Sequence, residues 1–225
     1  MIKLFGRMIP AALRGLTRPQ VTAAQPVSSK FRVLPHDIDM NMHLNNGRYM
    51  QIIDVNRMEF LIRTGVAGIL LDRPWKPILG STAIQFRREL RLWERAVAST
   101  RLVGWDNRWV YLEHRIETPL GRPVAIAMAK AGFRSEGAWV PVETLRRALP
   151  YVLPEMVLPA HVHAWRALDD VLSGQVGVKR EPTSGAEAGL DRQHVNSATK
   201  AARCGQSPAA DQPVLGLAHD ILLAE

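Results

Sequence analysis

One stretch of this 225-residue chain decides how its fold is interpreted, and it runs Asp37-Ile38-Asp39-Met40-Asn41-Met42-His43-Leu44-Asn45-Asn46-Gly47-Arg48-Tyr49. It holds two carboxylates, one imidazole and three side-chain amides, and a long apolar segment follows it. Packing does not explain so many polar side chains in so short a stretch, because polar side chains mostly lie outside protein cores. The stretch therefore predicts a functional site beside a buried helix.

The spacing of these polar residues indicates a kind of chemistry. Asp39, Asn41 and His43 occupy alternate positions, so they share one face if the chain is extended there. Residues 45–47 are typical of a turn and a helix start, where backbone N–H groups point outward without partners inside the helix. A general base, hydrogen-bond donors that polarise a carbonyl group and a helix end that binds an oxyanion would then lie close together. These are the groups that the hydrolysis of an acyl compound requires.

The stretch from Asp37 to Tyr49 resembles the D-x-D-x-N-x-H-x-N-N-x-x-Y signature of hotdog-fold thioesterases. It is similar to plant acyl-carrier-protein thioesterases and to acyl-CoA thioesterase-like proteins related to 4-hydroxybenzoyl-CoA thioesterase. A second stretch, from Trp109 to Arg115, is similar to a strand of the latter group. The resemblance covers roughly residues 31–150. It implies an α+β hotdog fold, in which an antiparallel sheet wraps around a long central helix, and chemistry without a metal or other cofactor.

The resemblance implies a catalytic role for Asp39, Asn41 and His43. Asp39 would act as general base for water or as a nucleophile that forms a mixed anhydride. His43 would be a base or an orienting partner, and Asn41 would orient the thioester carbonyl or the water. The plant enzymes also carry a catalytic glutamate about 34 residues beyond the histidine, where this chain has Pro77. That departure makes Asp39, rather than His43, the main candidate for the catalytic base or nucleophile.

The residues around this catalytic set are candidates for substrate binding. Asn46 and Gly47 stand at the expected helix start, so their backbone N–H groups are candidate oxyanion donors. Tyr49 is expected either to line the acyl pocket or to pack the helix against the sheet. Asp37 is expected to hydrogen-bond the turn. Glu113 and Arg115 share a strand face and predict a cross-strand charge arrangement.

Composition is that of a globular protein with one substantial core, at 47% hydrophobic and 22% charged residues. No apolar run reaches the roughly 18 to 20 residues that span a bilayer. The single cysteine, Cys204, excludes an intrachain disulfide and favours a reducing compartment, so we expect a cytoplasmic protein.

The formal net charge of +8 is concentrated near the N-terminus. No acidic residue precedes Asp37, whereas the segment before it holds six basic residues: Lys3, Arg7, Arg14, Arg18, Lys30 and Arg32. A nucleic-acid groove would need this charge on the core, so we do not expect a nucleic-acid partner. The phosphates of coenzyme A and an acidic acyl carrier protein both remain suitable partners.

Residues 2–16 predict an amphipathic helix whose apolar face consists of Ile2, Phe5, Ile9, Leu13 and Leu16. Three roles use that face: contact with an anionic membrane surface, organelle targeting, or docking on the folded domain. Residues 17–29 read as a linker. The predicted organisation is a basic amphipathic segment and linker over 1–29, the hotdog domain over 30–150, a helical extension over 151–172 and a flexible tail over 173–225.

Within the domain the pattern predicts helices over residues 46–64, 141–149 and 159–172, and strands over residues 31–34, 81–90, 95–105, 108–117 and 123–134. A strand, a long helix and then a run of antiparallel strands is the α+β plan in which one sheet curls around one helix.

We therefore expect an acyl-CoA thioesterase that hydrolyses a fatty or aromatic acyl thioester, as a homodimer or a dimer of dimers by resemblance. The alternatives are an acyl-carrier-protein thioesterase, a weakly active or non-catalytic hotdog acyl-binding protein at a membrane surface, and a hotdog hydratase. No G-x-S-x-G, Walker A, G-x-G-x-x-G or zinc-ligand pattern occurs in the sequence.

Overall fold

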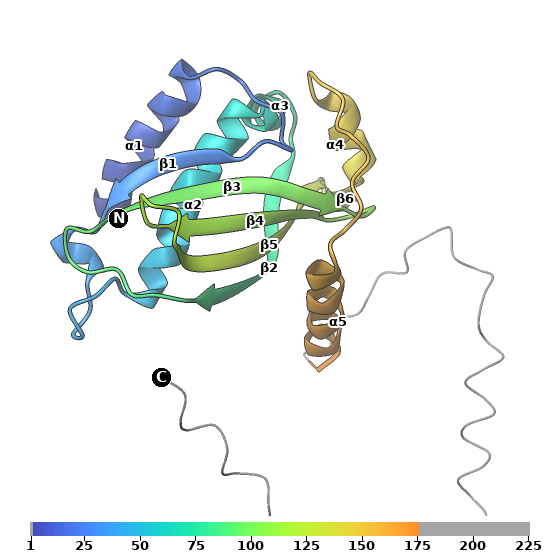
Figure 1. Ribbon diagram of the computed structural model, residues 1–225. Coiled ribbons are helices and arrows are strands. Elements are labelled where there is room, and N and C mark those ends of the chain that lie inside the picture. The colour runs from blue at the N-terminus through green and yellow to red at the C-terminus, as the bar shows by residue number, and fades with distance from the viewer. Residues whose placement is uncertain (1, 176–225) are drawn as a thin grey trace, which may run out of the picture. The chain divides into compact units, whose positions relative to one another are not determined.

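One long helix, α2 (Asn46–Arg63), is wrapped by a curled antiparallel sheet in the computed structural model, which describes residues 2–175 (Figure 1). The strand order is β1-β3-β4-β5-β2, and the short β6 pairs with β5. The strands are β1 (Val27–Arg32), β2 (Lys76–Phe86), β3 (Arg95–Trp105), β4 (Val110–Glu117), β5 (Pro123–Ser135) and β6 (Ala138–Val140). The predicted α+β hotdog arrangement is confirmed.

α2 forms where the sequence predicts because its ends carry the right residues. The side chain of Asn45 caps its start by accepting the N–H of Gly47 at 2.9 Å. Gly65 follows its end in the left-handed conformation, at φ 76°. The predicted face is buried against the sheet and consists of Tyr49, Ile52, Ile53, Asn56 and Phe60.

Four further α-helices occur among the described residues: α1 (Ile2–Thr17), α3 (Val66–Asp72), α4 (Val142–Ala148) and α5 (Ala160–Gln175). α3 and α4 share a core cluster with the end of β5. α5 covers the outer face of the sheet, where Val162 and Trp165 pack near Tyr111 of β4. All of these helices belong to one compact unit with the sheet.

β2 spans Lys76–Phe86 rather than the predicted residues 81–90, because its pairing with β5 begins earlier. Pro77 is tolerated there since β2 is an edge strand, where a missing N–H need not break the ladder. Gly80 stands at a break in the register, and a Cβ on it would lie 2.6 Å from the ring of Trp109. Proline and glycine thus hid the first half of this strand from the sequence pattern.

Other predicted boundaries agree closely with the structure. β3 has the predicted bounds, and β4, β5, α4 and α5 differ from prediction by a few residues at their ends. The predicted linker over 17–29 is wrong at its end, because Val27 is fully buried and starts β1 opposite Thr100. Three short elements have no predicted counterpart: α3, β6 and a 3-10 helix over Pro35–Asp37.

The predicted N-terminal helix is present as α1, and of the three roles left open for its apolar face, docking on the domain is not the one that the structure shows. Ile9, Leu13 and Leu16 are 57 to 74% exposed, whereas Ala11 and Gly15 on the opposite side are buried. Basic side chains of α1 also point toward the domain, where they pair with buried carboxylates.

Within the described part of the chain, no helix is both long and apolar enough to cross a bilayer. No group of three or more His, Cys, Asp or Glu side chains there is arranged to hold a metal. Cys204 and the predicted tail lie outside the described residues, apart from 173–175, which end α5.

Candidate active site

The loop over residues 38–44, which leads into α2, reverses direction instead of running extended. An antiparallel bridge joins Ile38 to Leu44, and the N–H of Met42 donates to the carbonyl of Asp39 at 3.1 Å. Met42 takes the left-handed conformation, with φ 62°. An extended chain, the condition for one shared polar face, is therefore not what the structure shows, because a tight turn replaces it.

The reversal nevertheless brings Asp39 and His43 together. Oδ1 of Asp39 lies 3.6 Å from Nδ1 of His43. Asn41 touches the same carboxylate, but it does so by donating its backbone N–H to Oδ1 at 2.9 Å rather than through its amide side chain. The side chains of Asp39 and His43 are 23% and 29% exposed, so water and a substrate can reach them. This separation is longer than a hydrogen bond, but catalytic contacts are often long without substrate and shorten when it binds, so a carboxylate and an imidazole placed in this way are candidates for proton transfer.

The start of α2 holds the predicted oxyanion donors. The N–H of Gly47 already donates to the side chain of Asn45, which caps the helix. The N–H of Asn46 belongs to the first turn, where backbone donors have no acceptor inside the helix. Of the two predicted donors, the N–H of Gly47 is therefore used by the cap, and the N–H of Asn46 is the one that can donate to a ligand. The helix dipole favours negative charge at this position.

Asp37 has the structural role that its position predicts. It is 3% exposed, and its Oδ2 accepts the N–H of Leu34 at 2.9 Å. The same oxygen pairs with the guanidinium of Arg7 from α1, and the carbonyl of Asp37 accepts the N–H of Asn45 at 2.9 Å. Asp37 thus fixes both the turn before the loop and the cap of α2.

Of the two roles left open for Tyr49, the structure shows packing. Its side chain is 2% exposed and lies in the core cluster between α2 and the sheet. Its ring meets Phe86 of β2 edge-on, at 5.0 Å between centroids. Burial raises the pKa of Tyr49 to about 12, so it stays neutral. Tyr49 does not line the cavity of about 290 Å³ that lies between the C-terminal half of α2 and the sheet.

The predicted cross-strand charge arrangement on β4 is confirmed. Oε1 of Glu113 accepts Nε of Arg115 at 2.7 Å and Nε of Arg101, from β3, at 3.0 Å. Burial opposes ionisation of Glu113, but the two arginines hold its pKa below the usual range. These residues stabilise the sheet and lie on a different part of the fold from the loop over 38–44.

A cavity of about 290 Å³ lies between the C-terminal half of α2 and the sheet, and sequence reasoning did not identify it. Its wall is apolar apart from Arg57 and Arg146, and includes Phe60, Leu102, Leu112 and Phe133. The pattern marked such residues as core, and no local signal distinguishes a core residue from a cavity wall. Pro77, where the sequence departs from the plant enzymes, is part of this wall.

Arg57 brings an unusual charge to that wall. Its Nη1 pairs with Asp54 at 3.0 Å, while Nε and Nη2 are buried without a hydrogen-bond partner among the described residues. Burial lowers the pKa of Arg57, and the nearby carboxylate of Asp54 opposes that effect. The cavity therefore offers an apolar volume with the hydrogen-bond donors of Arg57 in its wall.

The cavity and the loop over 38–44 are far apart in one copy of the chain. Arg57 lies eleven residues beyond Asn46 in α2, which is about 16 Å along the helix axis at 1.5 Å per residue. The cavity and the Asp39–His43 pair therefore stand at opposite ends of α2.

Protein THEM6 of Xenopus laevis is 37% identical over 83 residues, which cover 37% of this chain and 40% of that protein. The chain thus spans well under half of that relative's length.

Two solved structures share the fold. The probable thioesterase YbaW of Escherichia coli has a TM-score of 0.51 at 19% identity, covering 54% of this chain and 94% of its own. Protein SAV2348 of Staphylococcus aureus, solved in complex with CoA, has a TM-score of 0.51 at 13% identity, covering 64% of this chain and 95% of its own.

The model of the thioesterase-like superfamily matches residues 33–148, a span that includes the loop over 38–44, α2 and all six strands except β1. With the hotdog fold and the carboxylate–imidazole pair at the start of α2, this match shows that the chain belongs to the thioesterase-like superfamily.

Proposed function

We propose that this protein hydrolyses acyl-CoA thioesters, with a fatty or aromatic acyl group, to the free acid and coenzyme A. The single observation that carries the proposal is the Asp39–His43 pair, 3.6 Å apart and open to solvent, beside the start of α2. The superfamily match supports the reaction class. The CoA complex of the distant structural relative is a further reason to choose CoA over other thiols.

The proposed reaction uses this chain's own groups. Asp39 removes a proton from water while the oxygen of that water adds to the thioester carbonyl. The oxyanion that forms lies against the N–H of Asn46, a type of contact worth about 3 kcal/mol of barrier. The C–S bond then breaks, its electron pair leaves with sulfur, and the proton held by the Asp39–His43 pair neutralises the thiolate.

Direct attack by Asp39 is the other route to the same products. The carboxylate would displace the thiolate to form a mixed anhydride, which water then hydrolyses. Label found in Asp39 after a single turnover in ¹⁸O-labelled water would demonstrate the anhydride route. Label appears in Asp39 only if the anhydride forms and water attacks its aspartyl carbonyl, whereas general-base catalysis puts all label in the product acid.

We infer that the functional unit is a homodimer paired through β2. β2 is an edge strand of the described sheet, and Leu79 and Phe86 on it are 48% and 41% exposed. A long apolar edge strand without a partner invites pairing with another chain. Two copies related by a twofold axis would place the end of one β2 against the start of the other.

This pairing would also bring the separated parts of the site together. Phe86, at the end of β2, contacts Tyr49 in the first turn of α2, whereas Pro77 and Leu79, near the start of β2, line the cavity. Antiparallel pairing therefore sets the α2 start of one copy beside the cavity of its partner. Each site would use Asp39 from one copy and the acyl cavity of the other.

Thiol release from a panel of short, long and aromatic acyl-CoAs tests the activity. Asp39→Asn should abolish turnover, while the matched control Asp72→Asn, at an exposed aspartate on α3, should leave it unchanged. Turnover by Asp39→Asn at the wild-type rate would refute the proposed role of Asp39.

Mixing two inactive variants tests the shared site. Asp39→Asn lacks the carboxylate, and Ala131→Trp fills the cavity, where Ala131 is part of the wall. If each site spans two copies, heterodimers regain one intact site and activity returns on mixing. If each site lies within one copy, the mixture stays inactive although both variants remain dimeric by sedimentation.

A hotdog acyl-binding protein without turnover is the second candidate, and Pro77 in place of the plant enzymes' glutamate favours it. It predicts stoichiometric binding of acyl-CoA without thiol release. Release from acyl carrier protein alone would instead assign the carrier-protein substrate.

A further inference from the structure

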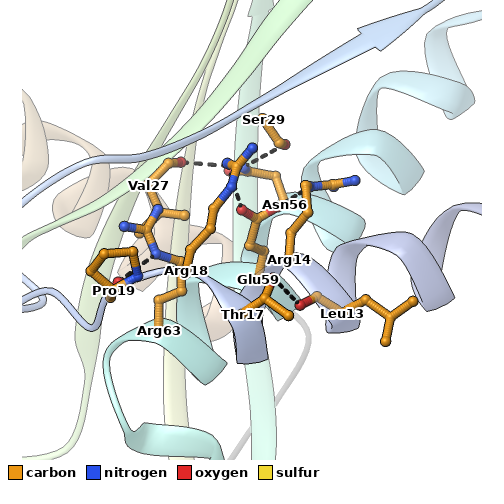
Figure 2. A network of polar contacts seen from close by, with 10 residues as sticks. All are labelled: Leu13, Arg14, Thr17, Arg18, Pro19, Val27, Ser29, Asn56, Glu59 and Arg63. Atoms are coloured by element: carbon orange, nitrogen blue, oxygen red, sulfur yellow. Dashed lines mark hydrogen bonds and ion pairs between the residues drawn. The ribbon is translucent and has the colours of Figure 1, made fainter.

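The orientation of α1 is set by charge. Figure 2 shows Arg14, in α1, and Arg18, the residue after its end, reaching to Glu59 of α2. Nε of Arg14 lies 2.9 Å from Oε2 of Glu59, and Nη1 of Arg18 lies 3.2 Å from Oε1. Glu59 is fully buried, and a buried carboxylate needs such partners. α1 therefore presents its basic side to the domain.

Close packing reinforces this orientation. Ala11 is fully buried, and a Cβ on Gly15 would lie 2.9 Å from Cβ and Cγ2 of Ile62 in α2. Glycine at this position lets the two helices approach closely. Nearer the N-terminus, Arg7 pairs with the buried Asp37, so both halves of α1 are held.

The consequence is an apolar stripe that faces away from the domain. Ile9, Leu13 and Leu16 lie on it and are 59%, 57% and 74% exposed. In the sequence Ile2 and Phe5 continue the same spacing. An amphipathic helix normally buries this face, so an outward-facing apolar stripe on a docked helix indicates an interaction surface.

The size of the stripe argues against a second copy as its occupant. A 16-residue helix is about 24 Å long, and a stripe about 10 Å wide on it offers roughly 240 Å². A stable protein–protein interface needs about 800 Å² from each partner. A helix that lies in the interfacial zone of a bilayer needs only its own apolar face, buried by about 5 to 10 Å.

Neighbouring charges favour an anionic bilayer. The carbonyl of Arg32 accepts Nη2 of Arg7 at 3.2 Å, so the end of β1 lies beside α1, as Figure 1 also shows. Lys30 and Arg32 on this strand are exposed. The first acidic residue of the chain, Asp37, is buried and already paired. Exposed cations near a helix whose apolar stripe faces outward are complementary to anionic lipid headgroups.

We propose that α1 binds the surface of an anionic membrane through Ile9, Leu13 and Leu16 while its basic side stays docked on the hotdog domain. The helix is then a rigid attachment rather than a flexible tether, because α1 is fixed on both Glu59 and Asp37. The membrane contact does not depend on the proposed hydrolysis, and it needs no turnover to be measured.

Co-sedimentation of the full chain with phosphatidylcholine vesicles, with and without phosphatidylglycerol, tests the proposal. The wild type should bind the anionic vesicles, and Ile9→Gln with Leu13→Gln and Leu16→Gln should lower its partition coefficient by about 100-fold. The matched control changes three exposed apolar residues elsewhere, Leu71→Gln, Leu120→Gln and Val152→Gln, and should bind like the wild type.

Unfolding curves check that the variants are folded. The proposal is overturned if the wild type ignores anionic vesicles, or if the α1 variant binds as well as the wild type. It is also overturned if, without lipid, the wild type forms a larger assembly than the α1 variant by sedimentation, since the stripe would then join copies of the chain.

Discussion

His114 gives the sharpest prediction about stability, because its hydrogen bonds define its protonation state. Nδ2 of Asn56 donates to the carbonyl of Val27 at 3.2 Å and to Oγ of Ser29 at 2.8 Å, which leaves Oδ1 of Asn56 as an acceptor (Figure 2). The hydroxyl of Thr100 donates to that oxygen at 2.6 Å, so it accepts from Nδ1–H of His114 at 2.8 Å. Nε2 of His114 is then unprotonated, and it is buried without a partner among the described residues.

The magnitude follows from the pKa. Burial, with a smaller contribution from the positive Arg57, lowers the pKa of His114 from 6.5 to about 3. Between those values the unfolded chain binds a proton that the folded chain excludes, so stability falls as the pH falls from about 6.5 toward 3. At pH 5 the loss is about 2 kcal/mol, a large share of the roughly 5 to 15 kcal/mol that holds a typical domain together.

Urea unfolding at pH 7 and pH 5 measures this effect. His114→Gln keeps an N–H donor for Thr100 but does not titrate, so its stability should change between the two pH values by about 2 kcal/mol less than that of the wild type. Titration of the other groups is common to both proteins and cancels in the comparison. An equal pH dependence in the two proteins would refute the assigned protonation state of His114.

Two further changes test buried charge. Arg14→Gln with Arg18→Gln leaves the fully buried Glu59 without a cation, so it should lower the free energy of urea unfolding by about 3 to 5 kcal/mol. The control Arg91→Gln, at an exposed ion pair, should lower it by less than about 1 kcal/mol. Similar losses in the two variants would mean that Glu59 is not buried against α1. Arg57→Met removes two buried polar groups, Nε and Nη2, that lack hydrogen-bond partners among the described residues. Its ion-pair partner Asp54 is half-exposed and stays in contact with water, so the variant should raise the free energy of unfolding by about 1 kcal/mol. A loss of stability would show that the removed N–H groups form hydrogen bonds.

Much of the fold was predictable because it depends on local periodicity. β3 and α2 alternate or repeat their apolar residues with the period of their own element, and each is bounded by turn or cap residues. β2 was only partly predictable, since Pro77 and Gly80 look like loop residues until β5 is available as a partner. Long-range pairing decided that boundary, and a single sequence does not contain it.

The candidate site was predictable in its residues but not in its shape. Asp39 and His43 meet as expected, yet they meet through a reversed turn rather than an extended face. The turn depends on the left-handed Met42, a conformation that methionine rarely adopts and that no propensity predicts. Tyr49 illustrates the opposite case, because only the position of Phe86 in space distinguishes packing from substrate contact.

The side of α1 that contacts the domain differs from what hydrophobicity alone indicates, for a related reason. Hydrophobicity alone assigns the side with Ile9 and Leu13 to the interior. The buried Glu59, in the middle of an otherwise apolar helix, reverses that assignment, because leaving a carboxylate unpaired in the core costs more than exposing a few aliphatic side chains. Glu59 is the residue that a sequence reader would need to recognise as buried.

The link from Arg7 to Asp37 has a practical consequence for anyone who shortens this protein. A basic amphipathic N-terminus invites removal as a leader, and trimming it would strip Asp37 and Glu59 of their counter-ions at once. Asp37 also holds the cap of α2 through Asn45, so the damage would reach the loop that carries Asp39. If a protein without α1 is inactive, the loss of activity would therefore reflect the loss of the contacts that hold the site in place, and would not show that α1 carries catalytic residues.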